Sequence, residues 1–136
     1  MKSKICLDTG IVTLYYLGDV PKEIDNLMQD ICNGSMIACM PNNLLIETYY
    51  HLCKGKGKDF ADSCLLSFRI KIPVTFIELS NTLILKAGQL KCRYRNELSY
   101  NDCIAIAVSL QESATLCTTE KEFPEIKNLK LKKYRF

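Results

Sequence analysis

The fold is decided by the stretch Lys4-Ile5-Cys6-Leu7-Asp8-Thr9-Gly10 near the start of the chain. Ile5, Cys6 and Leu7 follow one another without polar alternation, which is typical of a strand buried on both faces of a parallel sheet. Asp8 ends this apolar run. Because chemistry in open α/β sheets collects beyond the carboxyl ends of the strands, Asp8 is placed to hold a cation or take a proton. The alternative role for Asp8 is to cap the following helix.

Strand-like and helical patterns alternate along the rest of the chain. Short apolar runs predict strands at 35–40, 74–79 and 114–118, and lysines alternating with apolar residues predict an edge strand at 129–136. Helices are expected at 11–17, 21–32, 42–54, 59–69, 80–94 and from 99 onward. Gly55 and Gly57 are expected to end the third of them. This order predicts one α/β domain over residues 1–136, with three layers and a mainly parallel five-stranded sheet flanked by helices.

Composition excludes several classes of protein. The chain has 136 residues, 48% of them hydrophobic, and no apolar stretch approaches the roughly 20 residues of a membrane helix. No leader segment is visible, so we expect a cytoplasmic protein without membrane attachment. The eight cysteines include no CxxC pair, which argues against a zinc ribbon, and most lie in apolar runs. Disulfides among them stay open at this stage.

Charge is distributed unevenly between the two halves of the chain. The formal net charge is +3, with 8 basic and 9 acidic residues in 1–80 but 10 basic and 6 acidic residues in 81–136. A basic C-terminal half is compatible with a polyanionic partner. Solvated surface lysine is the alternative meaning of the same excess.

Four acidic residues lie where a strand gives way to the following helix or turn: Asp8, Glu47, Asp102 and Glu120. In a parallel sheet these positions share one rim, so the carboxylates are expected to crowd and raise one another's pKa. A divalent cation would relieve this repulsion. Oxygen ligands without accompanying cysteine or histidine spacing suit Mg²⁺ or Mn²⁺, and such a site fits metal-assisted phosphodiester hydrolysis.

Each of these acids could also have a purely structural role. Asp102 follows Ser99 by three residues, which is the acidic form of a helix capping box. Glu47 is compatible with a solvated helix position, and Glu120 with an ordinary turn acid. His51, the single histidine, is interpreted as a surface or hydrogen-bonding residue rather than a metal ligand. The four acids together favour a metal site more than any one of them does.

The order of these motifs resembles the PIN domain family, specifically the small single-domain type found in VapC-like toxins of toxin–antitoxin pairs. The resemblance rests on four segments: Leu7-Asp8-Thr9, Leu45-Ile46-Glu47, the run 98–105, and the run 116–123. It implies that Asp8, Glu47, Asp102 and Glu120 are the catalytic, metal-binding acids. The neighbouring polar residues that it implicates are Thr9, Thr118 and Glu122. The sequence departs from the family pattern in four places. Glu120 and Glu122 stand where aspartate is usual, Gly10 where serine or asparagine is frequent, and Cys103 where alanine is common, the last expected to affect only packing.

The resemblance implies a Mg²⁺- or Mn²⁺-dependent endoribonuclease, a hydrolase that is usually a homodimer and is held inactive by an antitoxin protein. Lys91, Arg93 and Arg95 are candidate contacts to RNA phosphates near Asp102. A solvated helix end favoured by the macrodipole is the alternative for them. A catalytically weak PIN-like module that binds RNA or protein is the competing function, supported by Glu120. A receiver-like phosphoryl-transfer domain would need a lysine at a strand end, and none is convincing.

Overall fold

The computed structural model describes residues 2–136 and contains a five-stranded sheet with six helices. The strands are β1 (Ser3–Leu7), β2 (Met36–Pro41), β3 (Val74–Ile77), β4 (Thr115–Thr118) and β5 (Lys130–Lys133). The helices are α1 (Thr9–Leu17), α2 (Lys22–Cys32), α3 (Leu44–Lys56), α4 (Lys58–Lys71), α5 (Asn81–Arg93) and α6 (Tyr100–Glu112). All strand pairs are parallel, in the order β3-β2-β1-β4-β5. The predicted α/β class with a parallel five-stranded sheet is confirmed.

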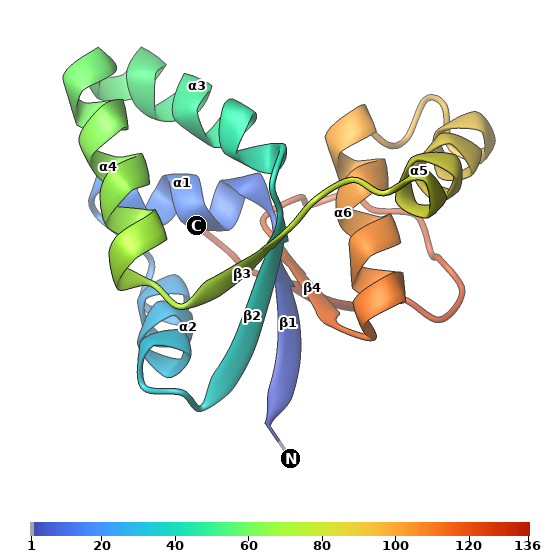
Figure 1. The fold of residues 1–136 in the computed structure, drawn as a ribbon, viewed down its shortest axis with the longest axis horizontal. Helices are drawn as coiled ribbons and strands as arrows, with labels where there is room; N and C mark the ends of the chain where they lie inside the picture. The colour runs from blue at the N-terminus through green and yellow to red at the C-terminus, as the bar shows by residue number, and fades with distance from the viewer. Residues whose placement is uncertain (1) are drawn as a thin grey trace.

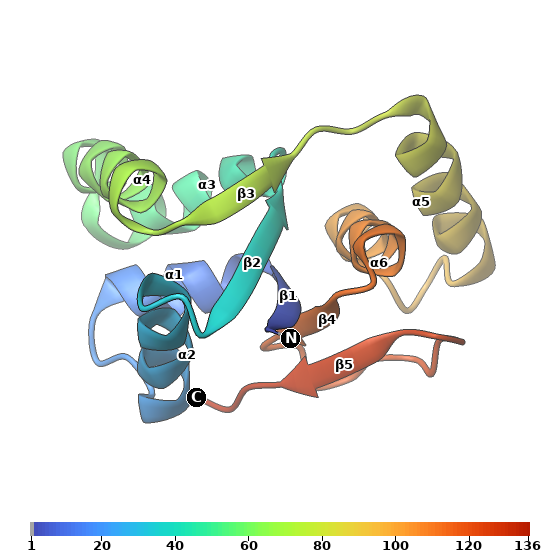
Figure 2. The same ribbon diagram turned by 60° about the horizontal axis from the view of Figure 1, so that its bottom comes forward.

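Helices cover the two faces of the sheet unequally (Figures 1 and 2). Helices α1 to α4 lie on one side, where α1 packs on α3 and α3 on α4. On the other side α6 lies directly on β1, β2 and β4, and α5 packs against α6. The central strand β1 is therefore covered on both faces, which explains its unbroken apolar run.

Helix α6 is buried on more than one side because it lies between the sheet and α5. Its residues 105–109 are all buried, and three of these five are alanine or serine, whose small side chains allow close packing on strands. The Ser109 hydroxyl turns back to the carbonyl of Ala105 at 2.8 Å, so this buried polar group is satisfied within the helix. This packing fixes the N-terminal end of α6, where the sequence predicts an acidic site.

The helices differ from their predicted bounds by one or two residues, and strands β3 and β5 end earlier than predicted, at Ile77 and Lys133. Two of the helix differences have a clear structural cause. Helix α1 begins at Thr9 rather than at residue 11, because the Asp8 side chain accepts a hydrogen bond from the Thr9 N–H and caps the helix. The predicted break at Gly55 is wrong, since Gly55 lies inside α3 and a Cβ there would approach Leu17 of α1 to 2.9 Å. Gly57 alone ends the helix, with φ of 92°. Within residues 2–136, each helix is too short or too polar to cross a lipid bilayer.

Candidate active site

The acidic residues meet at the carboxyl ends of β1 and β4, two neighbouring strands at the centre of the sheet. The chain crosses from β1 to β2 on one side and later returns to β4 on the other, so this edge is a topological switch point. A cavity of about 440 Å³ opens there. It is lined by Asp8, Thr9, Gly10, Thr13, Leu14, Glu47, His51, Ser99, Asp102, Thr119, Glu120 and Phe136. The structure thus brings Asp8, Glu47, Asp102 and Glu120 together in one pocket, which we call the acidic pocket.

Asp8 is the deepest of the four acids, with only 6% of its surface exposed. One carboxylate oxygen accepts the Thr9 N–H at 2.8 Å, and the other accepts the Thr118 hydroxyl at 2.8 Å. The pKa of Asp8 is raised to about 6, mainly by burial and also by the nearby charges of Asp102 and Glu120, while the two hydrogen bonds lower it. Asp8 both caps α1 and faces the pocket, so its two predicted roles are compatible.

Thr118 fixes Asp8 from the end of β4. Its hydroxyl donates to Asp8 Oδ2 and accepts the Glu120 N–H at 3.1 Å, so one buried side chain joins two of the acidic positions. The Thr9 hydroxyl lines the pocket and is buried without a hydrogen-bond partner among the described residues. An unsatisfied buried hydroxyl is unusual and is explained when a ligand completes it.

Asp102 sits in the first turn of α6 within a complete capping box. Its Oδ2 accepts the Ser99 N–H at 2.9 Å, and its own N–H donates to the Ser99 hydroxyl at 3.1 Å. The predicted role of Asp102 in a helix capping box is therefore confirmed. Its Oδ1 has no hydrogen bond within the described residues, and Asp102 also lines the acidic pocket. The capping box therefore orients the carboxylate and leaves one of its oxygens available to a ligand.

Glu47 enters the pocket from α3 and is held from two sides. Asn101 of α6 donates from Nδ2 to Glu47 Oε2 at 2.9 Å, and His51 Nε2 lies 3.6 Å from Glu47 Oε1. Asn101 is a site residue that sequence reasoning missed, and it joins the two helices that carry Glu47 and Asp102. His51, interpreted from the sequence as a hydrogen-bonding residue, lines the pocket beside Glu47.

Glu120 is the fourth acid of the pocket and lies two residues after the end of β4. Partial burial and the negative charges of Asp102 and Glu47 raise its pKa. Since Asp102 acts on both Asp8 and Glu120, and Glu47 acts on Glu120, the four carboxylates form one electrostatically coupled group. This coupling is the repulsion expected from the sequence.

Gly10 is required where α1 approaches the end of β4. A Cβ at this position would overlap the Thr119 hydroxyl oxygen and lie 3.2 Å from Thr119 Cβ. The close approach explains why Gly10 stands where the family often has a larger polar residue. Thr119 also lines the acidic pocket, as do Thr13, Leu14 and Phe136, and the sequence did not single out any of these four as a site.

Replacing Gly10 with alanine is expected to lower the free energy of unfolding by about 1–3 kcal/mol, because the added methyl group overpacks this contact. Urea denaturation measures the loss. Thr119→Ala removes the overlapping hydroxyl, so the double variant is expected to recover most of the stability. A double variant no more stable than Gly10→Ala would contradict this cause.

The remaining predicted residues lie outside the acidic pocket. Glu122 is exposed and does not line it. Lys91 donates to the carbonyls of Arg95 and Leu98 at 3.0 and 2.7 Å, so its ammonium group stabilises the loop before α6. Arg93 lies over the Tyr94 ring and lines a different cavity. A role of Lys91, Arg93 and Arg95 in RNA binding stays a prediction.

The acidic pocket has the chemistry of a divalent cation site. Four carboxylates and the unpartnered Thr9 hydroxyl supply hard oxygen ligands, and a cation would relieve the repulsion that raises the pKa of Asp8. Within residues 2–136 no three acidic, cysteine or histidine side chains converge closely enough to form a ready metal site. Side-chain rotation would be needed to bring the carboxylate oxygens to coordination distance.

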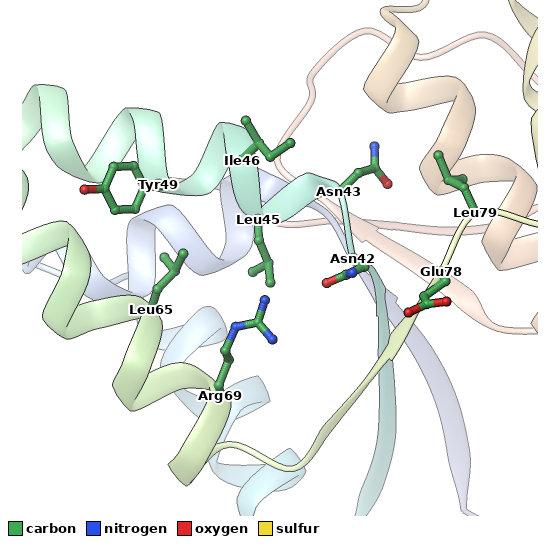
Figure 3. Close-up of a pocket in the computed structure, with 9 residues that line it drawn as sticks. All are labelled: Asn42, Asn43, Leu45, Ile46, Tyr49, Leu65, Arg69, Glu78 and Leu79. Atoms are coloured by element: carbon green, nitrogen blue, oxygen red, sulfur yellow. The ribbon is translucent and has the colours of Figure 1, made fainter.

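A second cavity, of about 610 Å³, lies between α3, α4 and the end of β3 and is largely apolar (Figure 3). Leu45 and Leu65 extend into the space between the two helices, and Arg69 extends from α4 toward Leu45. Glu78 is the one carboxylate that lines it. Because its lining holds no cluster of acids or nucleophiles, we assign the chemistry to the acidic pocket.

Comparisons with known proteins agree with the fold. Residues 5–129 match the family model of the PIN domain. Similar solved structures include VapBC2 from Rickettsia felis bound to a DNA fragment of its promoter (TM-score 0.75, 23% identity, 96% of this chain and 98% of that chain). A toxin–antitoxin complex from Klebsiella pneumoniae matches with TM-score 0.69 and 16% identity, over 97% and 99% of the two chains. VapC20 from Mycobacterium tuberculosis, described as a toxin that cleaves the sarcin–ricin loop, matches with TM-score 0.66 and 17% identity, over 82% and 85%. No curated protein matches the sequence.

Proposed function

The chain belongs to the PIN domain family, and from this premise we propose that it is a divalent-metal-dependent endoribonuclease, the toxin of a toxin–antitoxin pair. The observation that carries the proposal is the meeting of Asp8, Glu47, Asp102 and Glu120 in one pocket at the switch point of the sheet. Carboxylates crowded at one edge of the sheet raise one another's pKa, and a bound cation would compensate that repulsion.

In this proposal the four carboxylates hold Mg²⁺ or Mn²⁺. When bound, the cation would lower the pKa of a coordinated water and stabilise charge on the phosphate oxygens. Thr118 and the Thr9 N–H orient Asp8, Ser99 orients Asp102, and Asn101 orients Glu47. Either Glu47 or Glu120 would take the proton of the attacking water. Both line the pocket, and both are less buried than Asp8.

RNA as substrate and an antitoxin as partner are proposed by analogy with the structural neighbours. One neighbour is described as cleaving the sarcin–ricin loop, and another is a toxin–antitoxin complex. The proposal includes a homodimer and a cytoplasmic location, as the family resemblance implies. The competing function, a catalytically weak module that binds RNA or protein, is favoured by Glu120 in place of aspartate and by the incomplete convergence of the acids.

Purified protein is expected to cleave single-stranded RNA in Mn²⁺ or Mg²⁺ and to lose this activity in EDTA. Labelled RNA and DNA oligonucleotides of the same sequence, resolved on denaturing gels, measure the cleavage and the preference for RNA. Light scattering after size-exclusion chromatography measures the oligomeric state. RNA binding without cleavage in either metal would favour the competing module.

A further inference from the structure

A basic cleft of about 450 Å³ adjoins the acidic pocket, and the two share Thr119, Glu120 and Phe136. The other residues that line the cleft are Lys121, Lys133, Tyr134 and Arg135. Three of its seven residues are cationic and one is acidic, whereas no lysine or arginine lines the acidic pocket. The charge therefore changes sign across the boundary that Glu120 and Phe136 form.

The cleft is fixed to the same strand that orients Asp8. The Tyr134 N–H donates to the Thr118 carbonyl at 2.8 Å, which continues the pairing of β5 with β4, and the Tyr134 side chain is buried. Lys133 Nζ donates to the Lys121 carbonyl at 3.1 Å and links the end of β5 to the turn after β4. The end of β5 and the turn after β4 therefore fix the position of the cationic residues beside the acidic pocket.

An exposed aromatic ring marks the boundary between the two cavities. Phe136 is 68% exposed and lines both of them. Lys121 Nζ lies 5.6 Å from the centre of its ring. Exposed aromatic rings with neighbouring cations are the usual means by which proteins bind single-stranded nucleic acid, through base stacking and phosphate contacts.

We propose that this cleft binds the single-stranded RNA next to the scissile phosphate, with phosphates on Lys121, Lys133 and Arg135 and one base stacked on Phe136. The inference rests on the proposed function and names the part of the surface that holds its substrate. A pocket with four carboxylates repels a polyanion, and adjacent fixed cations offset that repulsion. Lys91, Arg93 and Arg95 line neither the acidic pocket nor the cleft, and their role in RNA binding stays a separate prediction.

The test measures binding of a fluorescent single-stranded RNA in EDTA, by anisotropy, at several salt concentrations. Lys121→Glu/Arg135→Glu is expected to weaken binding at least tenfold. It is also expected to flatten the plot of log affinity against log salt concentration by about 1.4 in slope, since each phosphate contact on a single strand contributes about 0.7.

Phe136→Ala is expected to weaken binding about tenfold, and Phe136→Tyr to restore it. The matched control, Lys127→Glu/Lys130→Glu, makes the same charge change at exposed positions outside the cleft and is expected to change binding less than threefold.

If RNA binding in EDTA is too weak to measure, the rate of RNA cleavage in Mn²⁺ gives a second measurement. The cleft variants are expected to raise KM at least tenfold with kcat within threefold of wild type, while circular dichroism confirms their fold. Unchanged binding and KM in the cleft variants, with wild-type cleavage intact, would overturn the cleft and leave the proposed function standing. Absence of both cleavage and RNA binding in the wild type would overturn both.

Discussion

Replacing Asp102 with asparagine is expected to lower the rate of metal-dependent RNA cleavage at least 100-fold while the protein stays folded. The variant removes a negative charge from the acidic pocket, and loss of several kcal/mol of metal-assisted stabilisation corresponds to about 100- to 1,000-fold in rate. Asparagine keeps an oxygen that can accept the Ser99 N–H, so the cap of α6 is retained. Initial rates under single-turnover conditions in Mn²⁺ measure the effect.

The matched control for this variant is Asp59→Asn. Asp59 is an exposed acid in the first turn of α4, so the control makes the same chemical change outside the acidic pocket. Its cleavage rate is expected to equal that of the wild type. If Asp102→Asn cleaves within about threefold of the wild type, Asp102 serves only as a helix cap and the proposed active site is wrong.

The strands and the positions of the acids could be predicted because each depends on local patterns. The unbroken run of Ile5, Cys6 and Leu7 indicates a buried central strand, and the polar break at Asp8 marks its carboxyl end. Strand-and-helix alternation then requires parallel pairing, which places the end of every strand on one edge. Convergence of the acids at that edge follows from topology alone.

Features that depend on contacts between distant segments could not be predicted in the same way. Gly55 and Gly57 look equally able to end a helix, and only the packing of Leu17 shows that Gly55 serves close approach instead. The bond from Asn101 to Glu47 joins residues 54 positions apart. Lys91 looks like a free cation in the sequence, but two backbone carbonyls use its ammonium group. Periodicity carries no information about such tertiary hydrogen bonds.

Asp8→Asn is expected to make the metal-free protein more stable than the wild type at neutral pH by about 3 kcal/mol. The Asp8 pKa is about 6 in the folded protein against an ordinary value of 3.8, and one pKa unit corresponds to about 1.4 kcal/mol. As pH rises from about 4 to above 6, the unfolded chain loses this proton first, so wild-type stability falls. The variant has no proton to lose at this position, and urea denaturation at pH 4 and pH 7.5 measures the difference between the two proteins.

Mn²⁺ is expected to cancel this difference in stability. At a concentration 100 times its dissociation constant, a ligand that binds only the folded state stabilises it by about 3 kcal/mol, which for a chain of this size is about 10 °C in Tm. The gain needs the Asp8 carboxylate, so Asp8→Asn is expected to show none, whereas Asp59→Asn responds as the wild type does. Equal stabilisation of Asp8→Asn by Mn²⁺ would place the metal elsewhere. Parallel pH curves for the wild type and Asp8→Asn would show that Asp8 ionises normally, so the buried carboxylate would no longer account for the need for a cation.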